Sequence, residues 1–375
     1  MLATLEVNLE ALRANALRMR DLVAPSKLAG VVKANAYGHG IVEVALAIES
    51  IVSRLCVYSL EEAVALRDGG ITAPILIMGP ISPVNLPAAH ESGAAIALWD
   101  TGSYVLALAT IARRRHSPFP VHMKVNTGVA RLGLSVADAT DAIEDFLHMP
   151  ELSVQGVFSH LANAEELDSS FTLAQLSAFD SALAPVRSIL EGGDNNCVAH
   201  IAASAAAMMW PQTRLDMVRV GIALYGLWPS AQTQDAMLHT DVTFQPALSF
   251  KSELVATQHV RAGEPVGYGG SYHASTDTTI GIVPVGYAEG VPRALSNRAS
   301  FVLNGRRCPV VGRICMNMTM IDVTDVLDAR PGSVVTLIGN DGNQSVTADD
   351  WANWAGTINY EIVTRLPSEL PRTYQ

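Results

Sequence analysis

The chain alternates eight times between a short apolar run and a helix-like stretch, from residue 28 to about residue 225. The runs are rich in β-branched residues, and several of the helix-like stretches end in Gly or Pro. Strands that alternate with helices form βαβ units and a parallel sheet. The predicted strands are Leu28–Lys33, Arg54–Tyr58, Pro74–Met78, Ala95–Trp99, Val121–Lys124, Val154–Ser159, Cys197–Ala202 and Arg219–Ile222.

Eight such units in about 200 residues predict a closed (β/α)8 TIM-like barrel. An open doubly wound sheet is the alternative, but no G-x-G-x-x-G follows the first strand. Residues 229–246 are polar and indicate a linker, after which apolar runs are separated by turn signals such as Asn304-Gly305. We therefore expect an α/β barrel over residues 1–240, followed by a C-terminal mostly β-strand domain over residues 241–375.

Composition excludes several classes of protein. The formal net charge is −11, whereas nucleic-acid binders usually carry a basic face. No segment approaches the ~20 apolar residues of a membrane span, and the N-terminus does not resemble a signal peptide. The four cysteines form no C-x-x-C pair, which argues against a zinc ribbon or a redox dithiol. We expect a cytoplasmic protein with reduced thiols, no metal site, and neither a nucleic acid nor a membrane as partner.

The segment VVKANAYGHG, residues 31–40, places Lys33 at the end of the first predicted strand. Active sites of barrels lie at this end of the strands. A lone lysine there often only extends its amine to solvent, but it can also be a Schiff-base lysine. Other strand ends bring Lys124, Arg131 and His160 to the same mouth.

Near the seventh and eighth strands, Ser204 opens a helix and Gly221-Ile222 follows Arg219. A hydroxyl beside a glycine that permits close backbone approach is typical of a phosphate site. Each feature alone is more often structural, but together with Lys33 they favour pyridoxal 5′-phosphate, which needs a lysine, a phosphate site and a ring-nitrogen partner.

Arg219 as that ring partner stays charged and only donates hydrogen bonds. The ring is then a weak electron sink, which favours racemisation over transamination. Racemisation needs an acid/base on each face of the α-carbon. Lys33 can serve one face. Candidates for the other face in the β domain are Tyr268, Tyr287, Cys315 and Tyr360, although tyrosines flanked by glycines are usually packing or turn residues.

At this point the residues match a known family. The chain resembles the alanine racemases, of the fold-type III class of pyridoxal-phosphate enzymes, over essentially all of its 375 residues. The motifs that carry the resemblance are VVKANAYGHG, MKVNTGVARLG, MVRVGIALYGL, VGYGGSY, PVGYAEGVPR, VGRICMNM and TINYEI.

The resemblance implies a two-base interconversion of L- and D-alanine, which supplies D-alanine for peptidoglycan. Lys33 and Tyr268 are the implied bases, and Tyr268 would act across the interface of a homodimer. Arg219 is implied to bind the pyridine nitrogen, with His160 between Arg219 and Tyr268. Lys124 matches a lysine that is often carbamylated.

The remaining implied positions fall into three groups. The phosphate would be bound by Tyr37, Ser204, Gly221, Ile222 and Tyr360. The substrate carboxylate would be bound by Arg131 and the backbone of Met316. The channel through which substrate enters would be lined by Tyr287, Arg293 and Arg313.

The sequence departs from the common family pattern at several places. Asn317 and Asn126 stand where aspartates are usual, Ala203 replaces a frequent asparagine, and Val291 replaces a frequent tyrosine. Asn317 removes a carboxylate charge next to the substrate site, which bears on substrate preference and turnover.

Three other functions compete with this interpretation. A decarboxylase of ornithine-like amino acids has a similar architecture but usually a carboxylate at the ring nitrogen, where this chain has Arg219. A broad-specificity racemase would typically be exported. A carrier of the cofactor would be a single barrel, without residues 241–375.

Overall fold

A computed structural model of the chain describes residues 2–184, 187 and 197–375. The chain forms two compact units. The barrel unit consists of Glu10–Ala36 and Ile41–Pro246, and the C-terminal unit consists of Met1–Leu9, Tyr37–Gly40 and Ala247–Gln375. The first residues of the chain thus belong to the C-terminal unit. The domain boundary at residue 240 stays a prediction.

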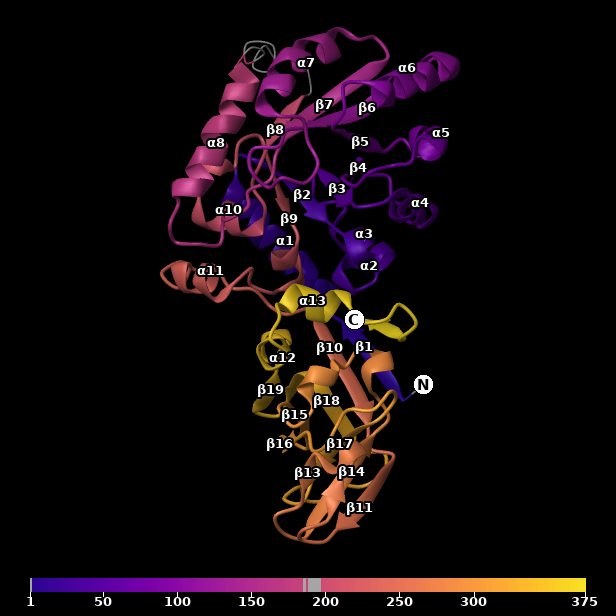
Figure 1. Ribbon diagram of the computed structural model, residues 1–375, viewed down its shortest axis with the longest axis vertical. Helices are drawn as coiled ribbons and strands as arrows, with labels where there is room; N and C mark the ends of the chain where they lie inside the picture. The colour runs from indigo at the N-terminus through magenta and orange to yellow at the C-terminus, as the bar shows by residue number, and fades with distance from the viewer. Residues whose placement is uncertain (1, 185–186, 188–196) are drawn as a thin grey trace. The chain divides into compact units, whose positions relative to one another are not determined.

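The barrel unit contains an eight-stranded parallel sheet in the order β8-β7-β6-β5-β4-β3-β2-β9 (Figure 1). Between the two end strands, the Asp216 amide donates to the Ala199 carbonyl at 3.2 Å and the Arg219 amide to the Ala202 carbonyl at 3.0 Å. These bonds bring the sheet close to full closure and confirm the predicted barrel. Its strands are β2 (Lys27–Val31), β3 (Arg54–Val57), β4 (Ile75–Ile77), β5 (Ala95–Leu98), β6 (Phe119–Lys124), β7 (Leu152–Phe158), β8 (Val198–His200) and β9 (Met217–Val220).

Helices surround the strands of the barrel (Figure 1). The first of them shows why: its buried residues include Leu12, Ala16, Met19 and Val23, which recur at helical spacing and form one apolar face. The helices that begin in the barrel unit, together with α1, whose first residue belongs to the C-terminal unit, are α1 (Leu9–Val23), α2 (Lys33–Tyr37), α3 (Ile41–Ile48), α4 (Leu60–Asp68), α5 (Leu86–Glu91), α6 (Ser103–Arg115), α7 (Val136–His148), α8 (Ser170–Leu183), α10 (Ser204–Met209) and α11 (Ala231–Ala236).

The predicted end of the first strand is wrong. β2 ends at Val31, and Lys33 is the first residue of α2 rather than the last residue of the strand. The reason is that the residues from Ala34 onward take left-handed backbone angles, which no strand can contain.

The C-terminal unit is built mostly of strands, as predicted. Its main sheet has the order β16-β15-β18-β10-β1-β20, with β19 paired to β18, and β11-β14-β17 form a second sheet. In β1, residues Ala3, Leu5 and Val7 are buried in strict alternation. The strands are β1 (Ala3–Val7), β10 (Leu248–Glu253), β11 (Ala256–Val260), β12 (Pro265–Val266), β13 (Tyr272–His273), β14 (Thr278–Val283), β15 (Ser300–Leu303), β16 (Arg306–Pro309), β17 (Thr319–Asp322), β18 (Val334–Asp341), β19 (Gln344–Val346) and β20 (Arg372–Tyr374).

Aromatic packing forms part of the core of the C-terminal unit. Trp351, in α12 (Ala348–Ala355), lies 6.2 Å from Phe250 and 6.0 Å from Phe301 between ring centroids. Its indole nitrogen donates to the Leu337 carbonyl at 3.0 Å, so the buried polar atom is satisfied. The last helix of the unit is α13 (Asn359–Thr364).

Among the residues that the structure describes, no helix combines the length and the apolar character that a membrane crossing requires.

Candidate active site

Lys33 lies just past the carboxyl end of β2, at the mouth of the barrel. The end of that strand is fixed from two sides, because the Tyr225 hydroxyl donates to the Val31 carbonyl at 2.9 Å and the Val32 amide donates to the Cys56 carbonyl at 2.9 Å. The lysine is half-buried at this mouth.

A left-handed turn follows Lys33. Ala34, Asn35, Ala36 and Tyr37 have φ between 52° and 55°, and each such residue costs about 1–2 kcal/mol. The surroundings stabilise the turn, since the Ala34 amide donates to a Glu62 carboxylate oxygen at 2.5 Å.

Two further hydrogen bonds support the turn. The Ala36 amide donates to the Val32 carbonyl at 2.9 Å, and the Asn35 side-chain oxygen accepts from the Ile41 amide at 2.9 Å. Strain of this kind is typical of functional sites.

The environment of Lys33 favours its neutral amine. Burial lowers the pKa of Lys33, and the positive charges of Arg131 and Arg219 lower it further, against an opposing effect of Glu62. A neutral amine is the form that attacks a carbonyl carbon, so this lysine suits covalent chemistry.

A second lysine lies beside the same mouth. Lys124 ends β6 and lies 5.5 Å from the ring centroid of Phe158. Burial, followed by the charges of Arg131, Arg219 and Lys33, lowers the pKa of Lys124 to about 8. Lys124, Arg131 and His160 line one small cavity of about 10 Å³.

Asn126 shapes the loop between Lys124 and Arg131. Its side-chain oxygen accepts from the amides of Gly128 and Ala130 at 3.2 and 3.0 Å. An amide oxygen is sufficient for this turn, so the loop does not require the aspartate that is usual at this position in the family the sequence resembles.

Arg219, in β9, is buried and is fixed by both of its terminal nitrogens. Nη1 donates to His200 Nδ1 at 2.7 Å, and Nη2 donates to the Ser159 carbonyl at 2.8 Å and to His160 Nδ1 at 3.2 Å. Nε makes no hydrogen bond to any residue that the structure describes. Burial lowers the pKa of Arg219 to about 10, so the guanidinium remains charged at neutral pH.

His160 is neutral at this site. Burial lowers the pKa of His160 to about 3, and the charges of Arg219 and Arg131 contribute to the shift. Because Arg219 can only donate, the Nδ1 atom of His160 accepts and its Nε2 carries the hydrogen. His160 can therefore donate a hydrogen bond through Nε2, on the side of its ring that faces away from Arg219.

The residues predicted for the phosphate are partly brought together within the barrel unit. The Gly221 amide donates to the Ser204 hydroxyl oxygen at 3.1 Å, and Ser204, Gly221 and Ile222 are buried. The hydroxyl hydrogen of Ser204 stays available for an acceptor such as a phosphate oxygen.

The C-terminal unit contains the other predicted residues. The rings of Tyr37 and Tyr360 lie 6.2 Å apart between centroids. Tyr268, in a short 3-10 turn with Gly269, is 71% exposed. Gly269 has φ +71°, and a Cβ there would lie 2.9 Å from Nη1 of Arg313, so glycine lets this guanidinium approach next to Tyr268.

The segment after β14 brings Tyr287 beside the chain around Met316. The Tyr287 amide donates to the Cys315 carbonyl at 3.1 Å, and the Ala288 amide donates to the Met316 carbonyl at 2.9 Å. Arg293, the remaining channel candidate, begins a further 3-10 turn and is exposed.

Asn317 has a carboxylate beside it. Its side-chain amide donates to Glu289 at 2.7 Å, and the other oxygen of Glu289 accepts from the Gly286 amide at 2.8 Å. An aspartate at position 317 would face Glu289 with like charge, which explains why an amide fits here.

Sequence reasoning missed Glu62 and His200. Glu62 completes a capping box with Ser59 at the start of α4, and the spacing S-x-x-E was a readable signal for the helix start but not for its contact with Ala34. His200 lies inside a predicted strand, where its contact with Arg219 depends on the closure of the barrel.

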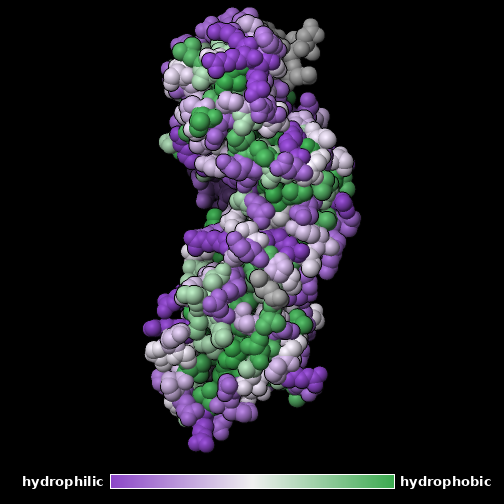
Figure 2. All heavy atoms as spheres, turned by 90° about the vertical axis from the view of Figure 1, so that its right-hand side faces the viewer, coloured by the Kyte–Doolittle hydropathy of each residue, from purple (hydrophilic) through white to green (hydrophobic). Residues whose placement is uncertain are grey.

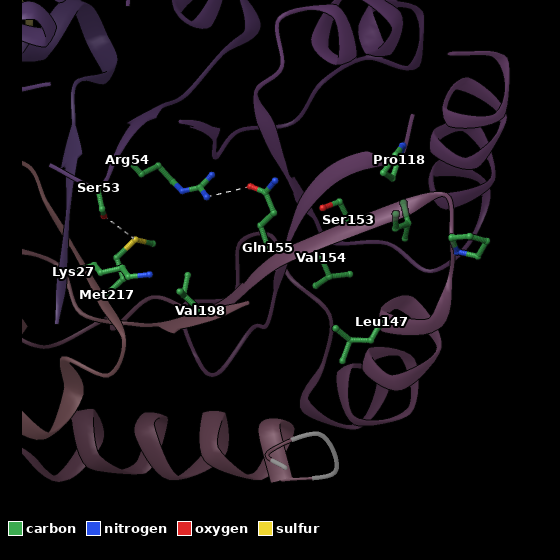
Figure 3. A pocket seen from close by; sticks show the side chains of 12 residues that line it. Lys27, Ser53, Arg54, Pro118, Leu147, Ser153, Val154, Gln155, Val198 and Met217 are labelled. Atoms are coloured by element: carbon green, nitrogen blue, oxygen red, sulfur yellow. Dashed lines mark hydrogen bonds between the residues drawn. The ribbon is translucent and has the colours of Figure 1, made fainter. Parts of the chain in front are cut away.

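A cavity of about 660 Å³ lies at the opposite end of the barrel, where the strands begin (Figure 3). It is lined by the first residues of β2, β3, β8 and β9, and Arg54 donates there to Gln155 at 3.1 Å. None of the predicted site residues lines it.

The chain is similar to known proteins over nearly its whole length. The family profile described as the alanine racemase N-terminal domain matches residues 7–229, and that of the alanine racemase C-terminal domain matches residues 247–374. An alanine racemase of Symbiobacterium thermophilum is 40% identical, covering 98% of this chain and 96% of that protein. One from Leptospira interrogans is 38% identical, covering 98% and 94%.

Solved structures show the same likeness. Alanine racemase of Clostridium difficile has a TM-score of 0.91 at 31% identity, covering all of this chain and 96% of that one. The enzyme of Bartonella henselae, solved with covalently bound pyridoxal phosphate, has a TM-score of 0.86 at 27% identity, with complete coverage of both chains.

Proposed function

This chain belongs to the alanine racemase family, and on that premise we propose which of its residues carry out the reaction. It is a pyridoxal-phosphate-dependent isomerase that interconverts L-alanine and D-alanine. The usual role of such an enzyme is to supply D-alanine for peptidoglycan. The observation that carries the residue assignment is the buried Arg219, whose Nη1 and Nη2 are both engaged while Nε is left to donate.

The chemistry of the barrel mouth fits this cofactor. Four basic side chains, those of Lys33, Lys124, Arg131 and Arg219, lie there. The charges of the two arginines lower the pKa of both lysines, and Glu62 opposes this effect at Lys33. Such an environment suits an anionic phosphate and a substrate carboxylate. Bound pyridoxal phosphate supplies an aldehyde that takes up the amino group of alanine and a ring that stabilises negative charge at the α-carbon.

Lys33 would bind the aldehyde and then act as one of the two bases. Its lowered pKa supports both tasks, because a neutral amine can bond to carbon or accept a proton. Arg219 Nε would donate a hydrogen bond to the ring nitrogen, and His160 Nε2 would donate one to Tyr268.

Tyr268 would be the opposite base, contributed by the partner subunit of a homodimer. Its exposed ring supports this assignment, since a tyrosine used only within its own unit would usually be packed. The C-terminal unit exposes further large apolar side chains, among them Tyr287, Met316 and Met318, and Figure 2 shows a hydrophobic area on the surface of this unit. Exposed apolar surface of this kind is typical of an interaction site.

The remaining assignments concern the substrate carboxylate, the phosphate and the substrate channel. Arg131 and the backbone of Met316 would bind the substrate carboxylate, and Lys124 would carry a carbamate that orients Arg131. The phosphate would be bound by Tyr37, Ser204, Gly221, Ile222 and Tyr360. The substrate channel would be lined by Tyr287, Arg293 and Arg313.

A cytoplasmic location is proposed on chemical grounds. Cys56, Cys197, Cys308 and Cys315 are all free, as expected in a reducing compartment.

The test is one exchange assay on the purified holoenzyme. Incubation with L-alanine in D2O should replace the α-proton and produce D-alanine to near-equal amounts, followed by NMR and chiral chromatography. Tyr268→Phe should keep the cofactor bound while slowing the reaction by a factor of about 10² or more. An unchanged rate in that variant would remove Tyr268 from the mechanism.

A further inference from the structure

A second histidine extends the contacts of Arg219 deeper into the barrel. His122, in the middle of β6, is fully buried, and its Nδ1 lies 2.9 Å from Nε2 of His200. The two rings meet edge to face, with centroids 5.1 Å apart and an interplanar angle of 71°.

Gly156 makes this contact possible. The two histidines lie on β6 and β8, on either side of β7, and Gly156 of β7 is paired with His122 in the register. A Cβ at position 156 would lie 2.3 Å from His122 Nδ1. A residue with a side chain would therefore displace the imidazole from His200.

The hydrogen bonds along this chain can run in one direction only. The guanidinium of Arg219 only donates, so His200 Nδ1 must accept. A neutral His200 then carries its hydrogen on Nε2 and donates it to His122 Nδ1. Burial keeps both imidazoles neutral, since it lowers the pKa of each well below the usual value.

A purely structural role for His122 explains the arrangement poorly. Nε2 of His122 is buried without a hydrogen-bond partner among the described residues. Such a donor destabilises the fold, whereas an apolar side chain of similar shape would not. Unlike an apolar side chain, the imidazole of His122 supplies an acceptor for His200.

We propose that His122 is a positioning residue, for which Gly156 makes room. By accepting from His200 Nε2, it satisfies the tautomer of His200 that Arg219 requires and holds the His200 ring with Nδ1 towards Arg219. It thereby orients the guanidinium so that Nε is left for the ring nitrogen. This inference rests on the proposed role of Arg219.

Two substitutions at position 122 can distinguish this role from packing, because the new side chains, Asn and Leu, have nearly the same shape. His122→Asn places an amide oxygen close to where Nδ1 was, so it can still accept from His200. His122→Leu removes the acceptor. In the holoenzyme we expect His122→Leu to lower kcat about tenfold with little change in KM, and His122→Asn to stay within about threefold of the unsubstituted enzyme.

Nitrogen-15 NMR of histidine-labelled holoenzyme gives a readout besides activity. The unsubstituted protein should show His200 neutral, with the hydrogen on Nε2. The Nε2 signal of His200 should keep its hydrogen-bonded shift in His122→Asn. In His122→Leu it should move, because the Nε2 hydrogen has lost its acceptor and the ring is no longer held.

The proposal would be overturned by a His200 with its hydrogen on Nδ1 in the unsubstituted protein, or by equal effects of both substitutions. If His122→Leu does not fold, the tautomer in the unsubstituted protein and the behaviour of His122→Asn still decide. Failure of the unsubstituted enzyme to racemise alanine would instead refute the proposed function, since the NMR measurement does not depend on turnover.

Discussion

At the residue scale, the most consequential feature is the concentration of positive charge at the barrel mouth. Burial disfavours the charged forms of Lys33 and Lys124, and the positive charges of Arg131 and Arg219 add to the effect. A larger fraction of each lysine amine is therefore neutral, and only the neutral amine is a nucleophile, whereas Arg219 stays charged. One environment therefore produces a reactive amine and a permanent cation side by side.

Lys124 should react with CO2 in a pH-dependent manner. With a pKa of about 8, its neutral fraction rises from about a tenth at pH 7 to about nine tenths at pH 9. CO2 adds only to the neutral amine, and the nearby Arg131 stabilises the resulting anion. Carbamylation should therefore increase over this range, as followed by 13C NMR of protein equilibrated with labelled bicarbonate.

The matched control for that measurement is Lys124→Met, in which the signal should disappear. A carbamate signal of equal strength in the control, or none in the unsubstituted protein at any pH, would contradict the assignment.

At the scale of elements, the left-handed turn after Lys33 is a strained backbone segment directly beside the proposed catalytic lysine. Four residues other than glycine share this backbone conformation. Glu62, at the start of α4, accepts from the amides of Ala34 and Tyr58 at 2.5 and 2.7 Å, so one carboxylate joins two neighbouring βα loops.

Removing that carboxylate should loosen the turn. Glu62→Ala leaves the Ala34 and Tyr58 amides without their acceptor, and we expect a loss of about 1–3 kcal/mol in the free energy of unfolding. Hydrogen exchange should speed up in residues 33–37, and kcat/KM should fall because Lys33 is less well positioned. Urea denaturation and mass-spectrometric exchange would measure both effects.

Glu61→Ala is the control, since Glu61 is exposed and adjacent on the same helix. It should change the unfolding free energy by about 0.5 kcal/mol or less. Equal effects of the two substitutions would mean that the contact with Ala34 contributes nothing specific.

At the scale of the whole molecule, the predicted site residues fall into two sets, one in each unit. Lys33, Lys124, His160, Ser204 and Arg219 belong to the barrel unit. Tyr37, Tyr268, Met316 and Tyr360 belong to the C-terminal unit. The proposed assignments therefore draw on residues of both units.

Mixing two inactive variants tests whether the sites are shared between subunits. Lys33→Ala and Tyr268→Phe each remove one base. If Tyr268 acts across the interface, half of the dimers re-formed from an equal mixture are mixed, and one of their two sites has both bases. Activity should then return to about a quarter of the unsubstituted level.

If Tyr268 acts within its own chain, the mixture stays as inactive as the separate variants. Light scattering on each sample gives the oligomeric state, and a monomer in the active sample would rule out the shared site.

The sequence by itself determined the barrel, the mostly β C-terminal region and the motifs of the site. This was possible because hydrophobic periodicity and turn residues are local, and because Lys33, Lys124 and Arg219 lie at or near strand ends. It extended the first strand two residues too far, to Lys33, since nothing in the residue types of Ala34–Ala36 demands left-handed angles.

Only the tertiary structure decided the contacts that join distant segments. Glu62 meets Ala34, Glu289 meets Asn317, and His122 meets His200 across the space that Gly156 leaves. These pairs are separated by 28 to 78 residues along the chain. Their geometry depends on the register of the strands and on the closure of the barrel, which are properties of the packed sheet rather than of any local segment.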